Sequence, residues 1–154
     1  MSNLRLREAD FADAESISLL MIPVVKEYVI NEYSEQGKKI ILQSMSVENI
    51  QSNLKSHYRY FLAENEGDDG VEVVGILGIK NEDHIFHCFV HRDFHRKKIA
   101  NKLWIYWLQQ NSPKQVSVNS SRYAINFYQS LGFEASGECF EKNGVVCYPM
   151  VFLR

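Results

Sequence analysis

The sequence predicts a mixed α/β domain, with a mostly antiparallel central sheet flanked by helices and the element order βααβββαβαββ. Short runs with the alternating pattern of strands follow one another along the chain together with longer runs of helical period. Two reversals, "NEGDDG" and "EKNG", separate strand-like runs and favour tight turns between antiparallel neighbours. At 154 residues the chain is long enough for one core, so we expect a single domain over residues 1–154.

The N-terminal segments are expected to form one strand and two helices. "LRLREA" (4–9) has the period of a strand, and Asp10 or Asp13 can cap the helix that follows. That helix has one apolar face, formed by Ile17, Leu20, Met21, Val24 and Val25. "YSEQGKK" is expected to be a loop, and a second, short amphipathic helix begins at Ser46.

The rest of the chain is expected to alternate between strands and helices. The expected strands are 58–64, 71–80, 84–91, 114–119, 133–140 and 146–153. The expected helices are 97–110, which ends near Ser112 and Pro113, and 121–131, which Gly132 ends.

Composition excludes several classes of protein. Apolar residues make up 45% of the chain and charged residues 23%, both near the globular average, and no window has the ~20 apolar residues of a membrane span. The first residues lack the apolar core of a signal peptide, and three cysteines are an odd count, so we expect reduced thiols and a cytoplasmic location. A net charge of −2 gives no overall attraction to nucleic acid.

One stretch, "HIFHCFVHRDFHRKKIANKLW" (84–104), concentrates histidine and basic residues. On a helix its histidines would share one face and could bind zinc or nickel; they are His84, His87, His91 and His95. The β-rich run between them favours a strand, however, which would turn His84 and His87 to opposite faces. No second cluster supplies further ligands, so we expect no metal.

The basic residues of this stretch lie where the strand ends and the next helix begins. They are Arg92, Arg96, Lys97 and Lys98. No aromatic residues alternate with them on an exposed strand, which disfavours nucleic acid as a partner. Unpaired backbone N–H groups and the helix dipole add to their charge at such a junction, which suits a diphosphate.

The segments "FVHRDFHRKKIANKLW", "VNSSRYAINFYQSLGF" and "NGVVCYPMVFL" together resemble the GNAT acyltransferase superfamily, which binds acetyl-CoA. The family landmarks present are Ala124, Phe127, Tyr128, Gly132 and Phe133. The family's pyrophosphate loop corresponds to His95, Arg96, Lys97, Lys98, Ile99 and Ala100. Here His95 replaces Gln or Arg, and Lys98 replaces a glycine. We expect Lys98 within the first turn of a right-handed helix, where a positive φ is not needed.

The resemblance implies transfer of an acetyl group from acetyl-CoA to a primary amine. His87, or else His84, has the residue type suited to take the proton of the amine, although either could be a structural histidine. A backbone N–H near Phe89 or Val90, where the family's strand bulges, would stabilise the oxyanion. Tyr128 aligns with the family's general acid, against the alternative of a core aromatic residue. Asn119 and Asn126 resemble positions that bind the pantetheine arm or the adenosine end.

The acceptor is expected between the first two helices and the last hairpin turn, near Tyr28, Glu32 and Tyr33. The acidic residues there would suit a cationic amine of a small molecule or a protein, or they are only a solvated helix end. Two other classes stay open: a non-catalytic CoA-binding regulatory module and a His-rich metal-binding domain. The apolar segments "IYW" and "YPMVFL" leave room for a homodimer.

Overall fold

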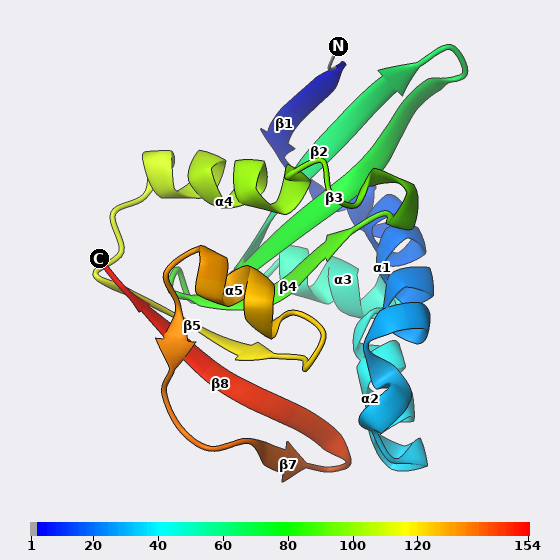
Figure 1. The fold of residues 1–154 in the computed structure, drawn as a ribbon. Coiled ribbons are helices and arrows are strands. Elements are labelled where there is room, and N and C mark those ends of the chain that lie inside the picture. The colour runs from blue at the N-terminus through cyan, green and yellow to red at the C-terminus, as the bar shows by residue number, and fades with distance from the viewer. Residues whose placement is uncertain (1–2) are drawn as a thin grey trace.

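The computed structural model describes residues 3–154 and has a central sheet with helices on both faces (Figure 1). The strands are β1 (Leu4–Glu8), β2 (Tyr58–Gly67), β3 (Gly70–Lys80), β4 (His84–Val90), β5 (Gln115–Ser120), β6 (Glu134–Ala135), β7 (Phe140–Lys142) and β8 (Val145–Leu153). The helices are α1 (Ala14–Tyr28), α2 (Glu35–Ser44), α3 (Val47–Leu54), α4 (Ile99–Gln110) and α5 (Ile125–Ser130). Among these residues no helix has the length and apolar character needed to cross a membrane.

The sheet has the strand order β1-β2-β3-β4-β5-β8-β6, with β7 paired to β8. Neighbouring strands are antiparallel except β4 and β5, which are parallel. The parallel pairing joins only His84 to Ser117 and Ile85 to Val118. Beyond these two pairs the strands diverge, and Figure 1 shows them opening toward α1. The sheet is therefore split at its centre.

Each face of the sheet has its own apolar core. One core packs under α4 and α5 and includes Leu103, Trp107 and Phe133. The other packs under α1, α2 and α3 and includes Met21 and Ile50. The split between β4 and β5 therefore lies between two well-packed cores, and this packing holds the residues on both sides of the split in place.

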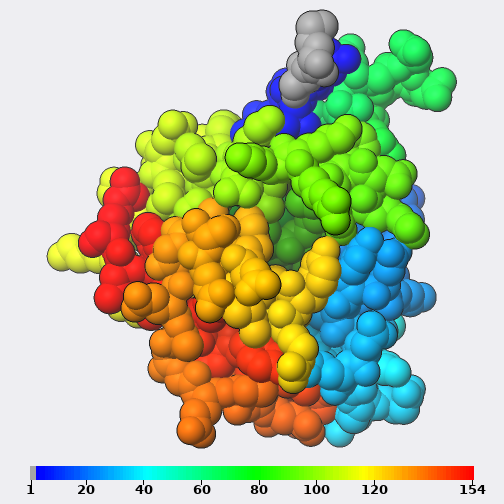
Figure 2. Space-filling model, in the orientation of Figure 1, coloured from blue at the N-terminus to red at the C-terminus, as the bar shows by residue number. Residues whose placement is uncertain are grey.

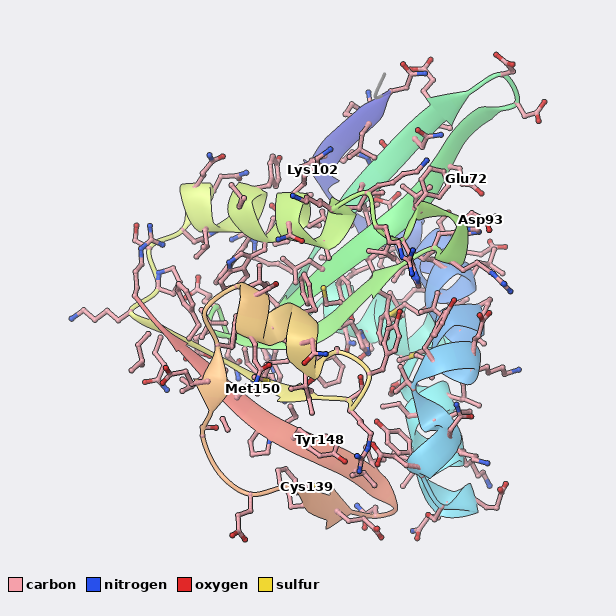
Figure 3. All side chains as sticks on the ribbon, in the orientation of Figure 1. Glu72, Asp93, Lys102, Cys139, Tyr148 and Met150 are labelled. Atoms are coloured by element: carbon pink, nitrogen blue, oxygen red, sulfur yellow. The ribbon has the colours of Figure 1, made fainter. Side chains whose placement is uncertain are left out.

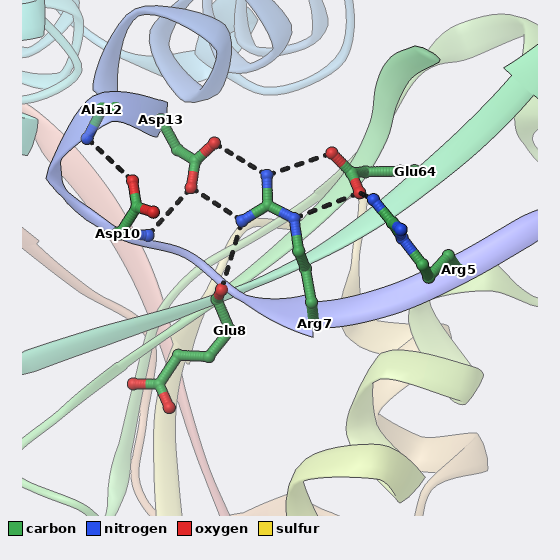
Figure 4. Close-up of polar contacts among 7 residues, drawn as sticks. All are labelled: Arg5, Arg7, Glu8, Asp10, Ala12, Asp13 and Glu64. Carbon is green, nitrogen blue, oxygen red and sulfur yellow. Dashed lines mark hydrogen bonds and ion pairs between the residues drawn. The ribbon is translucent and has the colours of Figure 1, made fainter.

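A charge network fastens β1 to the rest of the fold (Figure 4). The guanidinium of Arg7 donates to Asp13 at 2.8 and 2.9 Å and to Glu64 on β2 at 3.0 and 3.1 Å, and Arg5 adds a bond of 2.9 Å to Glu64. Hydrogen bonds from Arg7 lower the pKa values of both Asp13 and Glu64, because they favour the ionised carboxylates. Asp13 also accepts from the backbone N–H of Asp10, which closes a capping box ahead of α1.

The structure confirms the mixed α/β fold and the two tight reversals. Gly67 pairs with Gly70 across the β2–β3 turn, and the β7–β8 turn lies between Lys142 and Val145. Two expectations about elements were wrong. The supposed loop "YSEQGKK" starts α2, because Ser34 caps the helix by accepting from the N–H of Gly37 at 3.1 Å. The expected strand 133–140 is two short strands, β6 and β7.

Candidate active site

A cavity of about 850 Å³ fills the split between β4 and β5. Its lining comes from α1, α2, β4, the segment between β4 and α4, the start of α4, the end of β5, the β5–α5 loop and α5. Figure 2 shows the hollow between α5, the β5–α5 loop and the segment that precedes α4. The cavity thus extends from the N-terminus of α4 through the sheet to the layer of α1 and α2.

The segment that precedes α4 has an unusual backbone. Arg96 has a φ of 67°, and Lys98, the N-cap residue of α4, has φ 58° and ψ 30°. The expectation that Lys98 lies in the right-handed first turn is therefore wrong. A left-handed residue is needed just before α4, so this lysine carries a conformational cost that a glycine would not.

The backbone N–H groups of this segment are free to bind a ligand. Within the described residues, none of the N–H groups from Arg96 to Asn101 has a protein acceptor, and the first return to the helix pattern is Lys102 N–H to the Lys98 carbonyl at 3.0 Å. Left-handed residues at Arg96 and Lys98 flank Lys97, and such a backbone turns N–H groups toward one concave surface that suits an anion. The helix dipole adds partial positive charge there.

The side chains around this segment divide into two groups. Arg92, Arg96 and Lys98 line the cavity and supply positive charge. His95 also lines the cavity and fixes the loop, because its Nε2 donates to the Val90 carbonyl at 2.8 Å. Lys97 lies over the Phe94 ring at 5.0 Å and is not part of the cavity wall. Three of the four predicted basic residues therefore face the cavity.

Tyr128 belongs to α5, lines the wall of the cavity and is only 5% exposed. Its phenol lies near the thiol of Cys88 on β4, and each of the two groups affects the pKa of the other. Burial raises the pKa of Tyr128 well above its ordinary value and that of Cys88 to about 12. Both groups are therefore protonated at neutral pH, and the phenol can donate a proton.

The backbone of β4 turns alternate amides into the split. The N–H of His91 donates to the Val74 carbonyl on β3 at 2.8 Å. Because amide directions alternate along a strand, the N–H of Phe89 also faces β3, whereas those of Cys88 and Val90 face the split. Of the two predicted oxyanion donors, therefore, only Val90 has its backbone N–H directed toward the cavity. Phe89 contributes its side chain to the wall.

His87 is 4% exposed and belongs to a buried chain of hydrogen bonds. The Asn53 amide donates to the Tyr60 hydroxyl at 3.1 Å, and that hydroxyl lies 3.0 Å from Nδ1 of His87. Because the buried Tyr60 hydroxyl has no other acceptor within the described residues, we assign its proton to Nδ1, which leaves the ring proton on Nε2. Among the described residues, every fully buried side-chain nitrogen and oxygen has a hydrogen-bond partner. Nε2 of His87 has no protein partner in that part of the chain, so it is not fully buried. Nε2–H therefore faces the cavity that His87 lines. Burial lowers the pKa of His87 to about 3.

His84 does not reach the cavity wall. Its Nδ1 lies 2.7 Å from the Ser117 hydroxyl, and burial lowers its pKa. His84 and His87 pair with Lys80 and Gly78, two residues apart on β3, so both face the same side of the sheet. The predicted opposite orientation was wrong, because the register shift leaves Phe86 as an extra residue between them.

The wall toward α1 and α2 is aromatic and apolar. Tyr28 lines the cavity, stacks on Tyr123 with ring centroids 4.8 Å apart, and lies 5.2 Å from His95. Tyr33 is buried against the same wall, and burial raises its pKa to about 12.

Glu32 is outside the cavity lining and is held in a surface network. It accepts from Arg122 at 3.2 Å and from the hydroxyl of Tyr148, labelled on β8 in Figure 3, at 3.1 Å. Its charge is therefore already paired. Of the two predicted amides, Asn119 lines the cavity and Asn126 is exposed outside it.

Three residues of the site escaped sequence reasoning, namely Tyr60, Cys88 and Tyr123. Tyr60 is separated from its partner His87 by 27 positions, and only the strand register brings the two together. Tyr123 lies just before α5, and its ring stacks on Tyr28 at the cavity wall. Among residues 3–154 there is no group of three or more His, Cys, Asp or Glu side chains that could hold a metal ion.

Fold and site together define a class of protein: an α/β domain whose sheet splits beside the N-terminus of α4, where the backbone N–H groups have no protein acceptor within the described residues. The family model described as an acetyltransferase (GNAT) domain matches residues 29–154. The chain belongs to the GNAT family of acetyl-CoA-dependent acetyltransferases. A search of curated proteins finds no significant match.

Solved structures show the same fold at low sequence identity. A GCN5-related N-acetyltransferase from Rhodopseudomonas palustris has a TM-score of 0.82 and 19% identity, with 100% of this chain and 98% of that chain covered. The PaiA N-acetyltransferase from Thermoplasma acidophilum in complex with coenzyme A has a TM-score of 0.78 and 15% identity over 100% of both chains. The ribosomal-protein-S18-alanine N-acetyltransferase from Escherichia coli has a TM-score of 0.66 and 13% identity, covering 97% of this chain and 93% of that one.

Proposed function

We propose that residues 1–154 form an N-acetyltransferase domain that moves an acetyl group from acetyl-CoA to a primary amine by direct attack. The observation that carries the proposal is the row of unpaired N–H groups from Arg96 to Asn101, at one end of a cavity that continues to Tyr128. Such a row fits the diphosphate of coenzyme A, with Arg96 and Lys98 as cationic neighbours. Coenzyme A in the PaiA complex is consistent with this use of the fold.

The remaining contacts of the donor follow from the direction of the cavity. A pantetheine arm that runs from the diphosphate into the split replaces the missing strand pairing between β4 and β5. Asn119 is positioned beside this arm, and Asn126, on the exposed side of α5, is available to the adenosine end. The thioester then lies beside the N–H groups of Cys88 and Val90.

Attack by the amine lone pair forms the C–N bond and moves the carbonyl electrons onto oxygen. The Val90 N–H, aided by that of Cys88, stabilises this oxyanion, because both donors are fixed in the strand before the reaction. Collapse re-forms the carbonyl and breaks the C–S bond. Tyr128 gives its phenolic proton to the departing sulfur and regains one from the attacking nitrogen, directly or through water.

His87 is the predicted proton acceptor that lies at the cavity, whereas His84 is tied to Ser117. With its proton on Nε2 and a pKa of about 3, His87 fits a hydrogen-bond donor to the acceptor or the oxyanion better than a strong base. We therefore propose that the attacking nitrogen loses its proton to water, or to Tyr128 after Tyr128 has protonated the departing sulfur. Tyr28 and Tyr33 form the acceptor wall, and Glu32 acts from outside by holding the β5–α5 loop.

The setting fits the cytoplasm, because all three cysteines are free thiols. A homodimer through residues 105–107 and 148–153 stays a prediction; within these segments Trp107 and Met150 are buried in the chain's own core.

A pair of donors tests the proposal without any mutation. S-acetylpantetheine carries the same thioester as acetyl-CoA but lacks the diphosphate. We expect acetyl-CoA to raise the melting temperature and to bind at least ~100-fold more tightly by calorimetry, because several charge-assisted bonds are lost with the diphosphate. Equal affinity for the two donors would contradict the proposed grip. Binding of acetyl-CoA without thiol release for any amine would instead favour the non-catalytic module.

A further inference from the structure

The acceptor half of the cavity contains no carboxylate. Across the whole described lining, the charged side chains other than histidine are Arg92, Arg96 and Lys98, all in the segment between β4 and α4. The wall along α1, α2 and β4 and the residues that flank these helices presents Val24, Val29, Tyr33, Ile41, Met45 and Phe89. This part of the cavity therefore offers apolar contact and no counter-ion for an ammonium group.

The acidic residues near this wall are already paired outside it. Glu27 holds Arg92 at 2.9 Å, Glu32 holds Arg122 at 3.2 Å, and Glu35 holds Lys38 at 3.2 Å. None of these carboxylates belongs to the cavity lining. The suggestion that acidic residues near Tyr33 attract a cationic acceptor is therefore not supported by their positions.

The histidine of this half presents a hydrogen-bond donor to the cavity. His87 accepts from Tyr60 at Nδ1, so it presents Nε2–H to the cavity. An ammonium group has only donors and gains nothing from a second donor. A neutral amine leaves no charge unpaired beside this donor, and its apolar body matches the walls. Burial of an unpaired ammonium is far more costly than burial of a neutral amine.

We propose that the acceptor is an apolar monoamine, with one amino group on an aliphatic or aromatic body and no second charged group, which binds as the free base. This inference rests on the proposed acetyl transfer and specifies its substrate class. Polyamines and aminoglycosides carry several ammonium groups and are therefore excluded by the same wall.

A matched pair of amines tests the class. Hexylamine and 1,6-diaminohexane have the same six-carbon chain with a terminal primary amine. The diamine differs only by a second amino group at the other end, which is an ammonium group at neutral pH. The full chain is assayed by thiol release at saturating acetyl-CoA. We expect kcat/KM for hexylamine to be at least tenfold higher than for 1,6-diaminohexane. The kcat/KM for hexylamine should also rise about tenfold per pH unit between about pH 7 and about pH 9, as the free base becomes more abundant.

A variant and its control test the wall itself. Ile41→Asp places a carboxylate on the cavity wall from α2, and we expect it to shift the preference at least tenfold toward the diamine. Ile40→Asp is the control, because Ile40 is the neighbouring residue of α2, is 39% exposed and does not line the cavity. It should leave the preference unchanged.

The outcomes separate this inference from the proposed function. A preference of the unmodified protein for 1,6-diaminohexane would overturn the inference and leave acetyl transfer intact. So would thiol release with spermidine or kanamycin but with none of hexylamine, benzylamine and 4-methylaniline. Failure to bind acetyl-CoA at all would overturn the proposed function itself.

Discussion

At the scale of single residues, Tyr128 carries the sharpest expectation. Tyr128→Phe removes the phenolic proton and keeps the ring in the core, so kcat should fall about 100-fold while the affinity for acetyl-CoA stays unchanged. Thiol-release kinetics and calorimetry measure the two quantities. Tyr106→Phe is the control, because Tyr106 is a half-buried tyrosine of α4 outside the cavity. An unchanged kcat in Tyr128→Phe would remove Tyr128 from the chemistry.

His87 makes the stability of the protein depend on pH. The folded state holds its pKa at about 3, and the unfolded chain protonates it near about 6.5, so the unfolded state binds more protons between these values. Stability is therefore lost as the pH falls below about 6.5, at about 1.4 kcal/mol per pH unit from this residue. The pKa of His84 is also lowered, which acts in the same direction.

Urea unfolding at about pH 7 and about pH 5 measures this loss, which should be about 2 kcal/mol for His87. The carboxylates of Asp13 and Glu64 contribute only at lower pH, because their ordinary pKa values lie below 5 and the fold lowers them further. His87→Gln keeps an acceptor for the Tyr60 hydroxyl and cannot titrate. An equally steep loss in that variant would show that another group is responsible.

Lys98 offers a stabilising substitution. Because its φ is 58°, Lys98→Gly should raise the free energy of unfolding by about 1 kcal/mol, the usual cost of a non-glycine residue in the left-handed region. Lys97→Gly is the control, since Lys97 has no positive φ and should only lose stability. Chemical denaturation measures the free energy of unfolding of the two variants. A lower value in both would mean that glycine does not relieve the left-handed strain at Lys98.

At the scale of elements, α2 depends on one close contact. Gly37 lies against the β7–β8 turn, where the Ser34 N–H donates to the Gly144 carbonyl at 3.2 Å, and a Cβ at Gly37 would overlap that carbonyl. Gly37→Ala should therefore displace α2 and the acceptor wall that it carries. We expect a loss of 1–3 kcal/mol in stability, typical of overpacking, and a raised KM for the acceptor, with acetyl-CoA affinity unchanged.

Steady-state kinetics with calorimetry would separate these effects. Gly67→Ala provides the comparison, because nothing lies within 4 Å of a Cβ at Gly67. Weakened acetyl-CoA binding in Gly37→Ala would mean that α2 is coupled to the far end of the cavity, contrary to this expectation.

The same elements show what sequence alone could and could not predict. Strands with alternating patterns, the apolar face of α1 and the Asn143–Gly144 turn follow from local rules, and the structure confirms them. α2 was missed because Gly37 suggests a loop, whereas its role is a contact with a turn more than 100 positions away. Neither the extra residue Phe86 nor the bond between Tyr60 and His87 follows from spacing, because both depend on strand register.

At the scale of the whole molecule, a net charge of −2 conceals a strong separation of charge. The cations at the start of α4 line one end of the cavity, whereas the carboxylates on α1, α2 and the β2–β3 hairpin lie outside its wall. A phosphorylated donor is therefore attracted locally by a protein that is acidic overall. Exposed charges of this kind are screened by salt, whereas apolar contacts are not.

This separation predicts opposite salt responses for the two substrates. Between about 0.05 M and about 0.5 M salt, the affinity for acetyl-CoA should fall about tenfold, because salt screens the attraction of Arg96 and Lys98 for the phosphates. The KM of an apolar monoamine should stay constant or decrease, because salt does not screen burial of its body. Calorimetry and thiol-release kinetics over one salt series measure both. A rise in the amine KM parallel to the loss of acetyl-CoA affinity would mean that the acceptor is held by charge, and the apolar wall would then not be its binding surface.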